Sequence, residues 1–350
     1  MLFKPLILYH DAEGLRPQLG LETSDRVSTH WRLRGWLGYG TYRWAGAQGT
    51  PWRYGAELEW GRLTLLRLFA YDDVRERTLP RLLDQAPHAI PGTSRVYENS
   101  NRAYAFRWED LVREKAAGVF FRLAPWGPLE PYLTAGLYER IAAPDRWQGY
   151  QVSLGLVYLR ESTLLQRGSA LLRAAYQGPA IHFQVGALLG EGRSYPYLQA
   201  DLWHRWQAGR WADFEMRLSG LGFFSRESPA LWPLRLRSLQ VDFFSVPYAL
   251  AAHPMSKTST QVVYGFWRWS LPNRRFPSER WAPIFTLHLQ GAWLPDTLLP
   301  EIGLSVRGWA PPALTRLVQN LAFLELSLFT RLSANLPHQR FYLRMGFAPF

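Results

Sequence analysis

The nine residues WRYGAELEW, from Trp52 to Trp60, decide the fold class of this chain. Two sets of side chains alternate along them: Trp52, Tyr54, Ala56, Leu58 and Trp60 against Arg53, Gly55, Glu57 and Glu59. Successive side chains of a β-strand point to opposite faces of a sheet, so a period of two predicts one apolar and one charged face. The stretch therefore predicts a long strand, exposed to different surroundings on its two faces.

The same period of two continues along most of the chain, for example in Leu15–Glu22 and Ala212–Ser219. It predicts an antiparallel all-β protein with an even number of strands, about 16 and between about 14 and 18. The expected strands are residues 15–24, 29–41, 51–60, 63–72, 113–124, 129–139, 148–159, 168–177, 180–189, 195–206, 211–223, 259–269, 284–294, 300–309, 320–332 and 340–348. Helical windows are few, in parts of 110–117 and 312–320.

Strand length and aromatic spacing favour a transmembrane β-barrel over a soluble sandwich. Most expected strands have about 10 to 13 residues, enough to cross a bilayer at a tilt near 45°. Aromatic residues recur eight residues apart on the apolar face, and eight tilted residues span roughly 20 Å of the ~25 Å apolar band. We expect these residues to form the two aromatic girdles; the alternative is that aromatic residues are abundant enough for the spacing to arise by chance. The pairs are Trp31 with Tyr39, Trp52 with Trp60, Tyr150 with Tyr158, and Phe285 with Trp293.

The opposite register carries charges of both signs. In a soluble sandwich they would face bulk water, whereas in a membrane barrel they face the lumen, where opposite charges pair across strands. The mixture predicts a partly filled interior. The expected lumen-facing charges are Arg16, Glu22, Arg32, Arg34, Arg53, Glu57, Glu59, Glu130, Asp201, Arg205, Asp213, Glu215, Arg217, Glu301, Arg307, Glu325 and Arg331.

Composition excludes several other classes. The chain has no cysteine, so it holds neither disulfides nor a thiolate metal site. The longest uncharged run, Ala174 to Gly190, is too short for a membrane helix and contains Gly178-Pro179. The apolar run before His10 is too short for a secretory signal, so we expect either a removed signal or a domain of a longer chain.

The net charge of +12 invites a nucleic-acid interpretation. The arginines are spread along the chain, however, and no nucleic-acid-binding module is recognisable. Attraction to anionic lipid headgroups or lipopolysaccharide phosphates explains the excess better, with an anion-selective lumen as a second use.

We expect one domain, 1–350, made of a lead-in segment 1–14 and a barrel 15–350. Gly61-Arg62 and Trp126-Gly127 predict tight turns. The long stretches 73–112 and 225–258 are expected to cap or plug the lumen, and 235–244 is assigned to the second stretch because a seventeenth strand would break parity. An even count places both termini on one side, expected to be the periplasm.

The two ends of the chain resemble bacterial outer-membrane barrels. The end of the chain resembles the C-terminal recognition signal of these barrels, at positions Phe341, Leu343, Met345, Phe347 and Phe350. Pro349 breaks the alternation, so Phe350 is out of register with the other four. Leu8–Leu15, Gly20 and Trp36–Gly40 resemble the first hairpin of sixteen-stranded surface-antigen-type (insertase-type) barrels. They are also similar to the C-terminal barrels of Bacteroidetes-like periplasmic-domain fusions.

The resemblance implies a non-enzymatic outer-membrane protein without cofactor. It would act in outer-membrane protein assembly or translocation, with periplasmic or outer-membrane assembly proteins as partners, or anchor a periplasmic module. In the assembly role, substrate strands would pair at a weak seam between 15–24 and 340–348. The family's Arg-Gly-aromatic loop motif has counterparts in Arg34–Trp36 and Val306–Trp309, but neither lies in an expected loop, so we assign both to strands.

Evidence for catalysis is weak. No zinc-protease, nucleophile-elbow, phosphate-loop or EF-hand motif occurs. His204 falls on the lipid-facing register, where a lipase could use it with a serine, but an interfacial histidine is the commoner explanation. His10–Glu13 groups possible metal ligands that turn chemistry also explains. We expect no catalytic, cofactor or metal site; the alternatives are a passive or selective pore for small solutes and an outer-membrane lipid-modifying enzyme.

Overall fold

The computed structural model describes most of the chain as β-strand. The residues that it describes are 2–10, 14–23, 27–41, 50–76, 111–142, 144–160, 162–167, 170–175, 179–208, 212–225, 229, 231, 234–236, 257–272, 284–307, 323–332 and 341–348. Every regular element in these ranges is a strand. None of them contains a helix long and apolar enough to cross a membrane.

A single 16-stranded sheet forms the body of the protein, and neighbouring strands pair antiparallel in chain order. It begins with β1 (Leu2–His10) and ends with β20 (Phe341–Ala348). The strands between them are β2 (Gly14–Glu22), β3 (Trp31–Tyr39), β4 (Trp52–Gly61), β5 (Leu65–Glu76), β6 (Leu111–Arg122), β7 (Leu129–Ala142), β8 (Asp145–Leu159), β11 (Ala180–Gly190), β12 (Arg193–Ala208), β13 (Ala212–Phe223), β16 (Gln261–Pro272), β17 (Ile284–Leu294), β18 (Thr297–Arg307) and β19 (Phe323–Arg331). The expected all-β, antiparallel fold of about 16 strands is confirmed.

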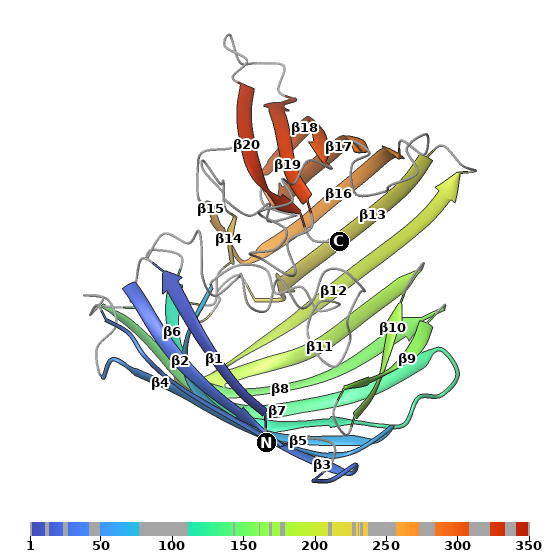
Figure 1. Cartoon of the computed structure of the whole chain (residues 1–350). Helices are drawn as coiled ribbons and strands as arrows, with labels where there is room; N and C mark the ends of the chain where they lie inside the picture. Colours follow the sequence, from blue (N-terminus) through green and yellow to red (C-terminus); the bar gives the residue numbers. More distant parts are fainter. Residues whose placement is uncertain are drawn as a thin grey trace.

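The sheet curls into an incomplete cylinder (Figure 1). β1 and β20 are the two ends of the strand order, and within the described ranges no backbone pairing joins them. Two short hairpins stand apart from the sheet: β9 (Ser162–Arg167) with β10 (Ala170–Ala175), and β14 (Leu234–Leu236) with β15 (Lys257–Ser259).

The expected start of the barrel was wrong. Residues 2–10, assigned to the lead-in, form β1 and pair with β2 from Leu2↔Glu22 to His10↔Gly14. Apolar residues fall on both registers of β1, which hides its period of two, and Pro5 argues against a central strand. Because β1 is an edge strand, the missing N–H of proline is tolerated. The seam of the sheet therefore lies between β1 and β20, not between 15–24 and 340–348.

The expected strand 168–177 was also wrong, and the two errors cancel in the strand count. Ala170–Ala175 pairs with β9 alone, while β8 pairs directly with β11. A six-residue strand followed by Gly178-Pro179 is too short to continue across the sheet. The helical window 110–117 lies in β6, where pairing with β5 and β7 overrides helix propensity. The window 312–320 falls outside the described residues.

The long connections contain less loop than expected. β5 continues to Glu76, so the connection before β6 is 77–110, which lies outside the described residues. Leu234–Leu236 forms a minor hairpin with 257–259, as expected for a segment that is not a barrel strand; 237–244 is not described.

The two tight turns are confirmed. Trp126 N donates to Leu129 O at 2.8 Å, and Gly127 has a φ of +58°. Gly61 has a φ of +106°, and a Cβ there would lie 2.0 Å from the carbonyl oxygen of Thr64. Only glycine fits that approach, which fixes the β4–β5 turn.

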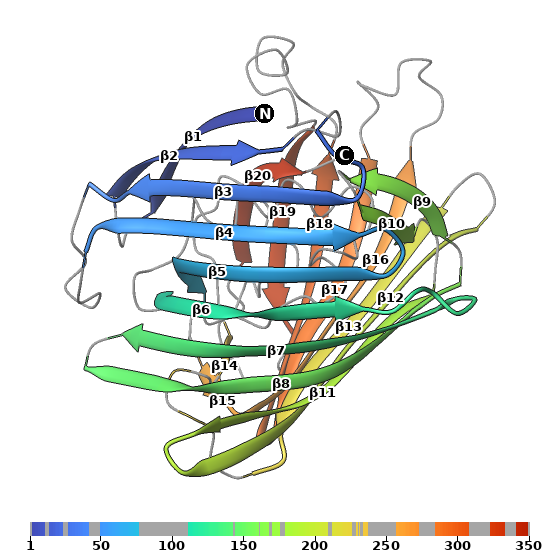
Figure 2. The same cartoon turned by 90° about the horizontal axis from the view of Figure 1, so that it is seen from below.

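Strand alternation defines two ends of the sheet. The terminal end holds the start of β1, the end of β20 and the β4–β5 turn. The loop end is the opposite one and holds the connections between β5 and β6 and between β13 and β16. Figure 2 shows the β9–β10 hairpin toward the terminal end and the β14–β15 hairpin toward the loop end.

Candidate functional site

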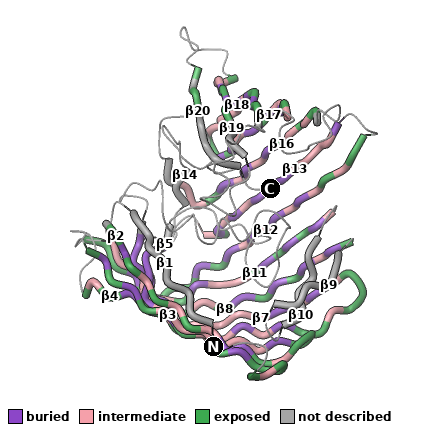
Figure 3. The backbone as a smooth tube through the Cα atoms, viewed as in Figure 1, coloured by how far each residue is buried: buried purple, intermediate pink, exposed green. Residues whose placement is uncertain are grey.

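The inner face of the sheet holds the expected charges. Burial alternates along many of the described strands, as Figure 3 shows. The buried members of the expected set are Arg16, Arg32, Arg53, Glu59, Glu130, Asp201, Arg217 and Glu301, and the half-buried ones are Glu22, Arg34, Glu57, Asp213, Glu215 and Arg331. Arg205 is exposed. Arg307 and Glu325 are Cα partners in the β18–β19 register, and their side chains are not described. That this face lines an aqueous lumen stays a prediction.

Glu59 is the centre of an ion-pair network on β2–β5. Its carboxylate lies 2.6 Å from the Arg32 guanidinium and 2.7 Å from that of Arg67. Arg32 also contacts Glu22 at 3.0 Å, and Arg34 contacts Glu57. Such a network forms because the β3–β4 register sets Arg32 opposite Glu59. Arg67 was missed in the sequence, although it alternates on the same register as the expected strand 63–72.

A second inner network joins β2, β5, β6 and β7. Arg16 donates to Asp73 at 2.8 Å, and both side chains are buried. Glu114 accepts from Tyr71 Oη at 2.5 Å and from Arg140 Nε at 2.7 Å. The sequence missed Asp73 because it was assigned to the loop 73–112. Glu114 lies in the expected strand 113–124, and Arg140 directly follows the expected strand 129–139, but the alternation there is weak.

Further pairs lie on β12, β13 and β16. Arg217 binds Asp201 through both Nε and Nη2, and Ser219 Oγ donates to the same carboxylate at 2.7 Å. Glu215 accepts from Arg268 at 2.8 Å and from Trp203 Nε1 at 2.9 Å. Opposite charges therefore neutralise one another on this wall, as the mixed signs predicted.

Neutral hydrogen bonds dominate the inner face between β7 and β12. Tyr132 Oη and His182 Nε2 are 2.5 Å apart. Gln184 donates to Ser153 Oγ at 2.6 Å, and Tyr197 Oη accepts from Gln151 at the same distance. These side chains were not expected as site residues, because uncharged polar groups give no signal without their partners.

An apolar cluster covers the same inner face near the loop end. Its buried members are Ala116, Tyr138, Trp147, Leu188, Tyr195, Tyr197, Leu221, Phe223, Val262, Tyr264, Phe266, Ala292 and Leu294. A wide water-filled tube would expose these side chains, so their burial indicates a filled interior at this level.

Leu231, a described residue of the connection between β13 and β16, lies against this interior. Leu231 is 3% exposed, and its carbonyl accepts a hydrogen bond from Arg140 Nη1 at 3.4 Å. Arg140 faces inward from β7, four strands away from β13 in the sheet order. Leu231 also has a φ of +67°, a conformation that a leucine adopts only under constraint. At the terminal end, β10 approaches both β4 and β8. The Leu231 contact supports the expectation that 225–258 caps or plugs the lumen, whereas the β9–β10 hairpin was not expected there.

The expected girdle residues lie on the outer face. All are exposed except Tyr158, which is half-buried; the exposed ones are Trp31, Tyr39, Trp52, Trp60, Tyr150, Phe285 and Trp293. Four of them form two cross-strand pairs at opposite ends of β3 and β4, and the Tyr39 and Trp52 rings are 5.0 Å apart. Their position at a membrane interface stays a prediction.

The remaining expected residues lie on strands or outside the described ranges. Phe341 and Leu343 are exposed on β20; the Met345 and Phe347 side chains and all of Phe350 are not described. Arg34–Trp36 lies in β3, and Val306 and Arg307 end β18, as strand residues.

The described residues include a close serine–histidine contact on the inner face, His288 Nε2 to Ser305 Oγ at 2.6 Å between β17 and β18. His204, the expected candidate, stacks on Trp206 with ring centroids 5.0 Å apart, next to Phe214, and its Nδ1 has no hydrogen-bond partner among the described residues. The same residues contain no group of three potential metal ligands, and Asp11–Glu13 is not described.

Comparison with known proteins finds similarity in structure but not in sequence. No family model and no curated protein matches the chain. BamA from Haemophilus ducreyi, in a crystal structure lacking POTRA domains 1–3, has a TM-score of 0.54 and 11% identity over 98% of this chain and 69% of that one. CdiB from Acinetobacter baumannii has a TM-score of 0.50 and 10% identity over 97% of this chain and 58% of that one. Similarity at these identities shows the fold alone: the chain has the β-barrel fold of these two structures.

Proposed function

We propose that this protein is an integral outer-membrane barrel of the surface-antigen type that assists membrane insertion or translocation of other polypeptides. The observation that carries the proposal is the sheet order, which leaves the outer edges of β1 and β20 without a partner strand among the described residues. An unpaired edge presents a row of N–H and C=O groups that can template an incoming strand. The shared fold with BamA and CdiB and the apolar outer face support the membrane location.

The two edges differ chemically. β1 contains Pro5, which has no N–H, so its pairing with any neighbour lacks one donor. β20 reads FYLRMGFA and contains no proline. We infer that β20 offers the better template and that β1 is the strand that yields when a substrate strand enters.

A disulfide across the seam tests the mechanism. The chain has no native cysteine, so an engineered pair is the only one present. One cysteine replaces Ile7 in β1, and the second replaces Leu343 or Met345 in β20. If the seam opens, oxidation blocks insertion of a small barrel substrate into liposomes, and reduction restores it. The matched control is a disulfide between Leu19 and Leu37, Cα partners on β2 and β3 inside the sheet.

Full insertion activity with the seam crosslinked would overturn the assembly role. The remaining role from the resemblance, an anchor for a periplasmic module, requires no opening and would survive that result. In both roles the termini are proposed to face the periplasm, with assembly proteins or the attached module as partners.

A pore is the second candidate, favoured by the charged inner face. The buried state of Arg16, Arg32 and Arg217 and the contact of Leu231 with Arg140 weigh against an open tube. Planar-bilayer recordings decide between the two: steady conductance of the unaltered protein that changes with Arg34→Ala would establish the pore.

A further inference from the structure

The outward side chains of the described strands are charged in one sector of the sheet. Among its described outward side chains, five are charged: Asp72, Arg113, Lys115, Glu139 and Arg146. All five lie on the consecutive strands β5 to β8, near the loop end. Charged residues on the lipid-facing side of a barrel are tolerated only toward the interfaces. A cluster on one sector thus points to something specific at that sector.

The depth of the cluster follows from the strand register. Glu139 is the Cα partner of both Lys115 and Gln148, while Leu137, two residues nearer the middle of β7, is the partner of Tyr150. The charges therefore begin one side-chain step beyond the Tyr150 level. That is the position of lipid headgroups if Tyr150 marks the edge of the apolar band.

The cluster exposes two of its cations, Lys115 and Arg146, and buries Arg113 and most of its carboxylate surface. Glu139 lies 2.8 Å from Lys115 Nζ and also contacts the Arg146 guanidinium. Its side chain is 13% exposed, whereas those of Lys115 and Arg146 are 40% and 63% exposed. Asp72 is buried under a bidentate pair with Arg113, with contacts of 2.8 and 2.6 Å. The solvent-facing groups are thus an ammonium and a guanidinium, both strong phosphate donors.

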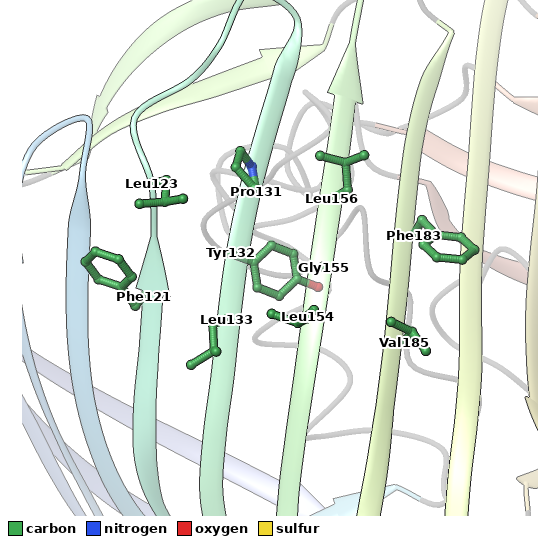
Figure 4. A pocket seen from close by; sticks show the side chains of 10 residues that line it. All are labelled: Phe121, Leu123, Pro131, Tyr132, Leu133, Leu154, Gly155, Leu156, Phe183 and Val185. Carbon is green, nitrogen blue, oxygen red and sulfur yellow. The ribbon is translucent and has the colours of Figure 1, made fainter.

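A hollow lies on the same face, nearer the terminal end (Figure 4). It measures about 480 Å³ and is lined by Phe121, Leu123, Pro131, Tyr132, Leu133, Leu154, Gly155, Leu156, Phe183 and Val185. Leu154 is midway between Tyr150 and Tyr158 along β8, so the hollow begins near the middle of the apolar band. From Glu139 to Leu133 the strand runs roughly 20 Å, or about 15 Å along the membrane normal at a tilt of about 40°. That is about half of the ~30 Å hydrocarbon core, the depth that one leaflet's acyl chains reach.

We propose that this sector binds a phosphorylated glycolipid of the lipid A type, with a phosphate on Lys115 and Arg146 and an acyl chain in the hollow. The assignment rests on the proposed outer-membrane location with the loop end outward. A phospholipid of the other leaflet would need its headgroup at the terminal end. There the described outward side chains within β5–β8 are uncharged, and the exposed cations Arg62 and Arg160 lie apart, in the β4–β5 turn and after β8.

Native mass spectrometry of the folded full chain in detergent measures the binding, with bis-phosphorylated lipid A as probe and phosphatidylglycerol as competitor. The variant K115A/R146A is compared with R62A/R193A, which removes two exposed arginines elsewhere and equals it in net charge. We expect about fivefold weaker lipid A binding per basic residue, hence about 30-fold for K115A/R146A, and no change for the control. Glu139→Gln removes the competing carboxylate and should strengthen binding.

Equal loss in both double variants, unchanged binding in K115A/R146A, or equal affinity for phosphatidylglycerol would overturn the site. Glu139→Gln keeps the proposal testable even if K115A/R146A folds poorly, because a folding defect would not strengthen lipid A binding. Weaker or unchanged lipid A binding in Glu139→Gln would count against the proposal. Variants that lose lipid A binding but keep insertion activity would show that this lipid site is independent of the seam. A failure of the proposed function at the seam would show in the crosslinking experiment and not in lipid A binding.

Discussion

Glu59 is the position where one substitution should disturb the inner face most. Its carboxylate is buried and within 2.8 Å of both Arg32 and Arg67, with Arg34 at 3.7 Å. Glu59→Gln keeps the shape but removes the carboxylate that Arg32 and Arg67 share. Arg32 retains Glu22 at 3.0 Å, whereas Arg67 retains no ion-pair partner among the described residues. Removing one partner of a buried ion pair costs about 3–5 kcal/mol, so we expect the free energy of unfolding to fall by about 4 kcal/mol.

Urea unfolding of the protein folded into detergent micelles measures this loss. With a slope of about 3 kcal/mol per molar urea, a loss of about 4 kcal/mol shifts the midpoint by more than about 1 M. The matched control is Glu57→Gln on the same strand and face. Glu57 pairs with Arg34 at 2.8 Å, but both side chains are roughly a third exposed, so its loss should cost no more than about 1 kcal/mol.

Similar small shifts for the two variants would refute the argument. They would mean that water enters the Glu59 network as freely as the Glu57 pair, and that the inner face is an open lumen. A large shift for Glu59→Gln alone supports the filled interior.

Three other substitutions test particular contacts. Gly61→Ala should lower the unfolding free energy by about 1–3 kcal/mol, because the φ of Gly61 is +106° and the new Cβ would meet the Thr64 carbonyl. The control Gly127→Ala, at φ +58° with open space around the new Cβ, should lower the unfolding free energy less in the same urea titration. Gly155→Ala places a Cβ 2.0 Å from the buried Tyr132 ring and should cost about 1–3 kcal/mol. Added to Tyr132→Ala, the same substitution should cost little, and an equal cost in both backgrounds would refute the clash. Arg140→Met removes the donor to the Leu231 carbonyl and should raise the frequency of conducting openings in planar bilayers; unchanged recordings would show that the contact does not hold the plug.

Part of the inner network was accessible from the sequence. Arg32, Arg34, Glu57 and Glu59 lie on the charged register of two long, regular strands, so their shared face follows from alternation. Their pairing does not, because Arg32 meets Glu59 only through the register of β3 with β4. Asp73 was placed in a loop, since the length of β5 depends on its partner β6, which begins 35 residues after β5 ends.

The boundaries of the sheet were harder to predict than its interior. β1 shows no clean period and contains Pro5, and both properties suit an edge strand that has one neighbour. Ala170–Ala175 shows apolar residues typical of a strand, yet it pairs only with β9. In both cases the outcome depends on which neighbour is available, a question that a local pattern does not address.

The sequence by itself determined that the chain is all-β, that its strands are long, and which side chains share a face. Side-chain direction alternates with every residue of a strand, so these properties are local and can be read from Trp52 to Trp60 alone. The tertiary structure decided the rest: that the sheet begins at Leu2, that Glu59 gathers three arginines, that Arg140 reaches Leu231, and that the outer charges collect on β5–β8. Each of these depends on register and curvature, which are set by hydrogen bonds between segments far apart in the chain.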